Sequence, residues 1–115
     1  MELGLAEREH DDWTVLTVSG EIDIATAPSL RERLHSLLAD GRHKLIIDLD
    51  DVGFLDSTGL GVLVGVLKRV RTQGGELRLI CTQPRIAKVF EITRLDSAFA
   101  IFDSLDGAVQ DGSPS

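Results

Sequence analysis

The chain has 115 residues, of which 43% are hydrophobic and 27% charged, a composition typical of one soluble globular domain with its own core. Its formal net charge of −7 argues against nucleic acid and anionic membranes as partners, because phosphate groups are bound by clustered cations. No apolar run approaches the roughly 20 residues of a membrane span, and the first residues lack the basic and apolar regions of a signal peptide, so we expect a cytoplasmic protein.

The N-terminal residues predict two strands. Residues 3–9 alternate weakly between apolar and polar side chains, as an edge strand does. Residues 13–19 alternate clearly and are rich in Val and Thr, which favour strands. We expect Gly20 to end this second strand.

Two carboxylates follow that glycine. If the chain is extended here, Glu21 and Asp23 share one face and Ile22 and Ile24 share the other, because side chains alternate along a strand. Residues 26–28 (Thr-Ala-Pro) then open a helix, since Thr is a usable cap and Pro is tolerated in a first turn. The helix is expected to bury a stripe of leucines, namely Leu30, Leu34, Leu37 and Leu38.

The middle of the chain predicts a buried strand followed by a second helix. Residues 45–49 form a continuous apolar run, which is typical of a strand buried on both faces. The helix is expected to begin at Asp56 or Ser57, because either side chain accepts hydrogen bonds from free N–H groups of a first turn. Gly61 and Gly65 share one face and are expected to allow close backbone approach. The apolar stripe of this helix is Leu60, Leu63, Val64 and Leu67.

The remaining elements alternate between strand and helix. Residues 76–81 predict a strand that ends at Cys81, the only cysteine, which we interpret as a buried structural thiol. Residues 82–84 start a third helix, and residues 98–102 predict a short outer strand. Ser104 is a candidate cap for a last short helix.

This element order predicts an α/β sandwich with a mixed sheet of four to five strands, about four helices and parallel later strands. One domain is expected over residues 1–111, with a mobile tail at 112–115. Functional groups in such sheets gather where the carboxyl ends of strands meet helix N-termini. Ser57 is expected at such a place, together with the connections 21–26 and 82–84.

Hydrolytic chemistry at Ser57 has little support. A hydrolase elbow requires glycine two residues before and two after the nucleophile, and Leu55 occupies the first of these places. The three histidines, His10, His35 and His43, fall in predicted turns or on a solvated helix face. A catalytic triad is therefore not expected.

The acidic residues in 48–51 follow the predicted buried strand, as do carboxylates that hold Mg²⁺ for phosphoryl transfer. Such enzymes need more chain for additional loops, and Asp is common in turns, so we interpret these residues as solvating a strand end and expect no metal site. A response-regulator receiver also has an acceptor Asp after a strand. That family needs an acidic pair directly after its first strand, whereas Asp11 and Asp12 precede a strand.

One stretch has a more specific pattern. Residues 56–63, Asp-Ser-Thr-Gly-Leu-Gly-Val-Leu, closely resemble the signature of the STAS domain of bacterial anti-sigma factor antagonists. Residues 20–28 resemble the early motif of that family, and residues 79–81 and 85–90 resemble its later strand and helix. The resemblance covers residues 3–109 and implies a STAS-like sandwich.

The resemblance implies a partner-switching regulator. The residue that matches the family's phosphorylated serine is Ser57, and its kinase would be an ATP-dependent anti-sigma factor. The unphosphorylated protein would bind that kinase and free a sigma factor, and a metal-dependent serine phosphatase would reverse the modification. The chain itself would be no enzyme and would need no cofactor, because ATP and Mg²⁺ belong to the kinase.

The same resemblance implies a partner-binding surface around Ser57. Asp23 matches the early-motif carboxylate that the family uses to engage the kinase, and Glu21 lies beside it. The full set of expected partner-binding residues is Glu21, Asp23, Ile24, Asp56, Thr58, Gly59 and Gly61.

Other interpretations remain open at this point. The chain would also suit a STAS interaction module that is never phosphorylated and serves a scaffold or a transporter. A small hydrolase or phosphatase is a further alternative. In the simplest interpretation Ser57 only caps a helix.

Overall fold

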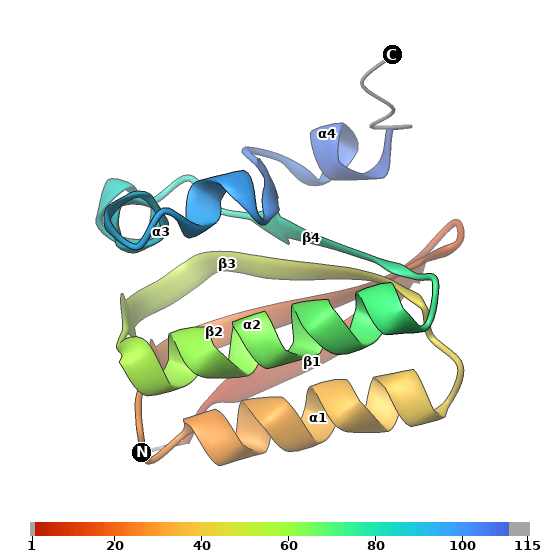
Figure 1. Ribbon diagram of the computed structural model, residues 1–115, viewed down its shortest axis with the longest axis horizontal. Coiled ribbons are helices and arrows are strands. Elements are labelled where there is room, and N and C mark those ends of the chain that lie inside the picture. Colours follow the sequence, from red (N-terminus) through yellow and green to blue (C-terminus); the bar gives the residue numbers. More distant parts are fainter. Residues whose placement is uncertain (1, 111–115) are drawn as a thin grey trace.

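The structure, a computed structural model, describes residues 2–110, and these form a mixed five-stranded sheet with helices on both faces (Figure 1). Strand β1 is antiparallel to β2, and all later neighbours are parallel in the order β1-β2-β3-β4-β5. The predicted α/β sandwich is therefore confirmed. The elements are β1 (Gly4–His10), β2 (Trp13–Ile22), α1 (Ala27–Ala39), β3 (Lys44–Leu55), α2 (Ser57–Thr72), β4 (Glu76–Ile80), α3 (Pro84–Ile92), a 3-10 turn (Leu95–Ser97), β5 (Ala100–Phe102) and α4 (Leu105–Val109).

Two apolar clusters hold the layers together. The larger one joins α1, α2 and α3 to one face of the sheet, and it contains all four leucines predicted for the first helix. The smaller one joins α4 to the other face, where Trp13 and Ile46 are buried. Burying both faces of the central strands explains why residues 45–49 are apolar at every position except Asp48.

Strand β2 does not end at Gly20, so that prediction was wrong. Gly20 has a φ of +108°, a conformation that favours glycine, and the pairing of β2 with β3 shifts register on both sides of it. Pairing then resumes, with Glu21 opposite Phe54 and Ile22 opposite Leu55. Because β2 continues, β3 also runs to Leu55, well past the predicted end of that strand.

The alternation predicted for residues 21–24 holds only as far as Ile22, which is fully buried. The chain turns after Ile22, so Asp23 and Ile24 are not in a strand. Ile24 is 73% exposed and does not share the environment of Ile22.

Helix α2 buries Leu60, Leu63 and Leu67 as predicted, while Val64 is only partly buried. Within the domain, the close backbone approach expected at Gly61 and Gly65 does not occur: a Cβ added at either one would meet nothing within 4 Å. The close approach occurs at another glycine of the same helix, as described below.

The last elements agree with the predictions in kind. Strand β5 is shorter than expected, and the Ser104 hydroxyl caps α4 by accepting a hydrogen bond from the Gly107 N–H at 3.0 Å. Cys81 is buried, and this burial raises the pKa of its thiol. The predicted tail, residues 112–115, lies outside the described residues.

One buried residue was not anticipated. Arg78 on β4 is 8% exposed, with its guanidinium 4.4 Å from the ring centre of Trp13 and 5.6 Å from that of Phe102. It donates hydrogen bonds to the carbonyl oxygens of Ala108 and Gln110. The hydrogen bonds and ring contacts of this one arginine therefore link α4 to the sheet.

Candidate functional site

The ends of β2 and β3 bring two loops together at one edge of the sheet. Glu21 pairs with Phe54, and the N–H of Asp56 donates to the Ile22 carbonyl at 3.1 Å. The connection that begins at Asp23 therefore adjoins the start of α2. This is the edge of the sheet at which the sequence analysis expected functional residues.

Asp56 caps α2. Its backbone is extended, with φ −100° and ψ −178°, and its Oδ1 accepts a hydrogen bond from the Gly59 N–H at 3.0 Å. An acceptor at this position satisfies one of the free donors of the first turn. Ser57 is therefore not the cap, and the interpretation in which it only caps the helix is wrong.

The Ser57 side chain is left free by this arrangement. It is exposed, and it makes no hydrogen bond with any residue in 2–110. Within the same described range, the backbone N–H groups of Ser57 and Thr58 also have no acceptor, because the helix ladder starts at Leu60, which donates to the Asp56 carbonyl. A hydroxyl at the positive end of a 16-residue helix thus has unused donors beside it.

Gly59 is the point at which α2 touches the end of β2. A Cβ at Gly59 would lie 2.3 Å from Cγ2 of Ile22 and 2.9 Å from Cδ1 of Leu55. Only glycine allows this approach. Gly59 is buried, whereas Thr58 and Gly61 are exposed, so Gly59 supports the site from inside and the other two face outward.

The loop after β2 is held by its own hydrogen bonds. The Asp23 carboxylate accepts from the N–H groups of Ala25 at 2.9 Å and Thr26 at 3.0 Å. The Thr26 hydroxyl does not cap α1 as predicted; it donates instead to the Glu21 carbonyl at 2.7 Å. These bonds turn the chain so that Ile24 projects into solvent.

Acidic and apolar groups surround this edge. Glu21, Asp23 and Asp51 line a hollow of about 390 Å³ at the end of the strands. Phe54 is 44% exposed although it is a large aromatic residue. The sequence analysis did not assign Phe54 to the site, and its signal was a large apolar side chain next to the Asp-Ser-Thr-Gly run.

The connection between β4 and α3 is hydrogen-bonded to β3. The Asp50 carboxylate accepts hydrogen bonds from the N–H of Thr82 at 2.7 Å and from its hydroxyl at 3.0 Å. The Gln83 amide donates to the carbonyls of Asp50 and, at 2.8 Å, Val52. This connection therefore has a structural role along the extension of β3.

Asp48 also bonds locally, since its Oδ1 accepts from the Asp50 N–H at 3.0 Å. Burial raises the pKa of the Asp48 carboxyl, and the nearby carboxylates of Asp50 and Asp51 raise it further. In residues 2–110 no group of three or more His, Cys, Asp or Glu side chains is placed to hold a metal ion.

Comparison with known proteins decides the family. The family model of the STAS domain matches residues 5–108. The chain belongs to the STAS domain family. A relative named anti-sigma-B factor antagonist, from Bacillus subtilis, is 39% identical over 110 residues, which are 96% of this chain and 100% of that protein.

Solved STAS structures agree with this assignment. An anti-sigma factor antagonist from Mycobacterium paratuberculosis has a TM-score of 0.86 at 33% identity, covering 93% of this chain and 91% of that one. The anti-sigma factor antagonist SpoIIAA has a TM-score of 0.72 at 19% identity in its unphosphorylated form, covering 98% of both chains. The phosphorylated form of SpoIIAA from Bacillus has the same TM-score and the same identity, with 92% of this chain and 96% of that one covered. At that identity the likeness shows the fold.

The site of this STAS domain contains no hydrogen-bonded serine–histidine pair within the described residues. None of the helices in residues 2–110 combines the length and the apolar character needed to cross a membrane. What the edge does present is a free hydroxyl at a helix N-terminus, an acidic hollow and two exposed apolar side chains, Ile24 and Phe54.

Proposed function

We propose that this STAS domain is an anti-sigma factor antagonist that is switched by phosphorylation of Ser57. The observation that carries the proposal is the state of the Ser57 hydroxyl, which is exposed and free of hydrogen bonds within residues 2–110 while Asp56 caps the helix. A relative of nearly the same length that bears the name anti-sigma-B factor antagonist supports the role.

In the proposed cycle the unphosphorylated domain binds an anti-sigma factor that is an ATP-dependent serine kinase, and a sigma factor is released. The kinase transfers the γ-phosphoryl group of ATP to the Ser57 oxygen, the hydroxyl loses its proton, and ADP leaves. Release of the phosphorylated domain ends the interaction, and a serine phosphatase restores the hydroxyl by hydrolysis. All catalytic groups belong to the two enzymes.

The domain is well suited to carry the phosphoryl group. The backbone N–H groups of Ser57 and Thr58 are unused within the described residues, and the positive end of α2 favours an anion. The SpoIIAA fold matches this chain with a TM-score of 0.72 in both its unphosphorylated and its phosphorylated form. Phosphorylation is therefore expected to leave the fold intact.

The effect on binding is electrostatic. A phosphoserine adds about 1.5 to 2 negative charges. If a carboxylate or phosphate of the partner lies about 6 Å away, each pair of unit charges costs roughly 3 kcal/mol at an effective dielectric near 20. This corresponds to on the order of a hundredfold loss of affinity. The acidic hollow lined by Glu21, Asp23 and Asp51, at the ends of β2 and β3, adds to the negative field.

The partner-binding surface in this proposal is the edge around Ser57. Glu21, Asp23, Ile24, Asp56, Thr58 and Gly61 were expected there, and we add Phe54 because it is 44% exposed beside them. Gly59 contributes indirectly, since it is buried and sets the distance between α2 and Ile22.

The decisive experiment incubates the full chain with its anti-sigma factor kinase and ATP, followed by phosphopeptide mass spectrometry. We expect one phosphate on Ser57, none in the Ser57→Ala variant, and unchanged modification in the Ser36→Ala control, which removes an exposed hydroxyl on α1. A dominant phosphate elsewhere, or binding of the kinase without any phosphorylation, would refute the switch and favour a non-cycling STAS interaction module.

Asp23 allows its charge to be separated from its structural role. Asp23→Asn keeps the oxygen that accepts the two N–H bonds of the loop, whereas Asp23→Ala removes it. If the carboxylate engages the kinase, both variants lose phosphorylation, and Asp23→Asn loses it with little change in thermal stability. Full phosphorylation of Asp23→Asn would show that only the loop geometry matters.

A further inference from the structure

Helices α1 and α2 lie side by side on one face of the sheet (Figure 1), and a groove of about 620 Å³ runs along them on the side away from the strands. We call it the α1–α2 groove. Basic, polar and apolar residues all contribute to its lining. It is lined by Arg31, His35, Thr58, Gly61, Val62, Gly65, Val66, Lys68, Arg69 and Thr72.

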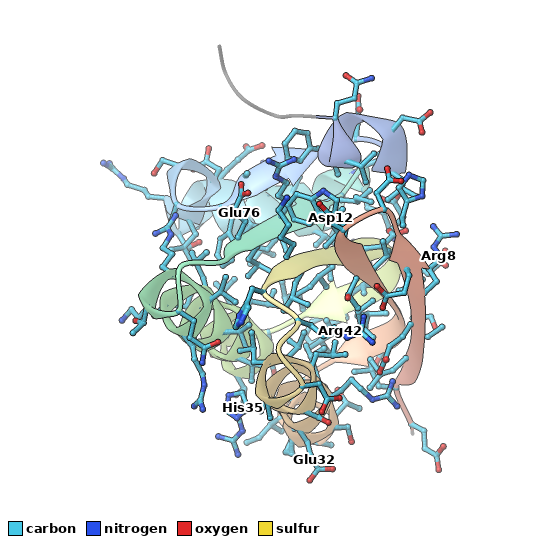
Figure 2. All side chains as sticks on the ribbon, turned by 90° about the vertical axis from the view of Figure 1, so that its right-hand side faces the viewer. Arg8, Asp12, Glu32, His35, Arg42 and Glu76 are labelled. Atoms are coloured by element: carbon cyan, nitrogen blue, oxygen red, sulfur yellow. The ribbon has the colours of Figure 1, made fainter. Side chains whose placement is uncertain are left out.

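The charge of the α1–α2 groove is opposite to that of the protein. The chain has a net charge of −7, yet Arg31, Lys68 and Arg69 line the groove and no carboxylate does. None of these three cations forms an ion pair with a residue in 2–110. On α1, His35 lies toward α2 and Glu32 points away from it (Figure 2).

The two glycines of the groove are not required by the internal packing. A Cβ at Gly61 or Gly65 would meet nothing within 4 Å, unlike one at Gly59. Glycine inside a helix is unfavourable relative to alanine. The helix therefore carries two destabilising residues, four positions apart on one exposed face, whose absent side chains leave room only for something outside the domain.

The length of the groove indicates what fills it. Its residues run from Thr58 to Thr72, and at 1.5 Å per residue this part of α2 is about 21 Å long. That length corresponds to about four turns of a second helix. Glycines at a spacing of four allow two helix backbones to approach closely, and Val62, which is only partly buried, supplies apolar surface beside them.

We propose that the α1–α2 groove binds an acidic amphipathic helix of a partner protein. Small or apolar side chains of that helix pack on Gly61 and Gly65, and its Asp or Glu side chains face Arg31, Lys68 and Arg69. The cations select for acidic partners, and the glycines select for a helix that can approach closely. This docking surface shares Thr58 and Gly61 with the surface proposed for the kinase and extends from there along α2 to Thr72.

The test begins with display of random 16-residue peptides, selected on the full chain and counter-selected on the Gly65→Leu variant. A Cβ at position 65 would meet nothing within 4 Å, and leucine favours a helix more than glycine does, so this variant should fold with unchanged or higher melting temperature while its side chain obstructs the groove. We expect the peptides that discriminate between the two proteins to be acidic and to have helical amphipathic spacing.

A selected peptide is then titrated by fluorescence anisotropy. Replacing Arg31, Lys68 and Arg69 together by alanine should weaken binding about tenfold, since each exposed charge pair contributes modestly. Raising NaCl from 50 to 500 mM should weaken it by a similar factor. The matched control replaces Arg85 and Lys88, two exposed cations on α3, and should bind as the wild type does.

Several outcomes would overturn the proposal. They are selected peptides that are basic or neutral, peptides that bind Gly65→Leu equally well, or no discriminating peptide at all. Inorganic phosphate or ATP that displaces the peptide at micromolar concentration would instead indicate a small-anion site. Sedimentation that shows a dimer lost in Gly65→Leu would indicate that a second copy of the chain occupies the groove.

Discussion

Gly59 gives the sharpest quantitative test of how the site is built. In the Gly59→Ala variant the new methyl group would lie 2.3 Å from Cγ2 and 3.2 Å from Cβ of Ile22. Both atoms are next to the Ile22 backbone and belong to a β-branched side chain, so they cannot rotate away cheaply. Either α2 or the end of β2 has to move.

The magnitude follows from two opposing effects. Overpacking of a buried contact usually costs about 1–3 kcal/mol, and replacing a helical glycine by alanine returns up to about 1 kcal/mol. The expected net loss is about 1–2 kcal/mol in the free energy of unfolding, or roughly 4–8 °C in Tm for a domain of this size. Gly61→Ala, two residues nearer the middle of α2 and in open space, should gain about 0.5–1 kcal/mol.

The free energy of unfolding of both variants can be measured by urea denaturation, followed by the fluorescence of Trp13, the only tryptophan. Because Ile22 adjoins Asp56, Gly59→Ala should also slow phosphorylation of Ser57. If Gly59→Ala is as stable as the wild type, the close contact between α2 and β2 is not tight in solution. The reasoning that assigns Gly59 a supporting role would then fail.

Asp56→Ala should lose the helix cap and about 1 kcal/mol of stability, whereas Ser57→Ala should change stability by less than about 0.5 kcal/mol, as thermal melts will show. Arg78→Lys should lower the free energy of unfolding by about 1–2 kcal/mol and change the near-UV circular dichroism of Trp13, because lysine cannot bind two carbonyls while stacked on a ring. The raised pKa of Asp48 means that the native state binds protons more tightly than the unfolded state. Stability therefore falls as pH rises from the ordinary value of 3.8 through the raised one, and Asp48→Asn should be more stable than the wild type at pH 7 but not below pH 3.8 in urea titrations.

Matched variants exclude trivial explanations for these results. Asp56→Asn keeps an acceptor oxygen and should recover the stability that Asp56→Ala loses. Arg85→Lys replaces an exposed arginine on α3 and should leave both stability and circular dichroism unchanged. Asp12→Asn removes an exposed carboxylate and should show no gain over the wild type at pH 7. An equal response from a variant and its control would count against the assigned role.

The sequence by itself determined the elements and their order. The leucine stripe of α1, the apolar run of β3 and the hydroxyl cap of α4 were each readable because they depend on spacing or on side chains within one turn. The run Asp-Ser-Thr-Gly predicted a strand end followed by a helix N-terminus, which the structure places between β3 and α2, and the family comparison agrees with the resemblance it suggested.

The tertiary structure decided which groups are free to act. Asp56 and Ser57 are equally good caps in sequence terms. In the structure the Asp56 N–H donates to the Ile22 carbonyl, which fixes the backbone directly after β3 so that the Asp56 carboxylate accepts from the Gly59 N–H. Likewise Gly59 and Gly61 look alike in the sequence, yet one touches Ile22 and the other faces open space. Local patterns act over a few residues, whereas exposure depends on partners more than thirty residues away along the chain, and those partners are set by how β2 and β3 pair.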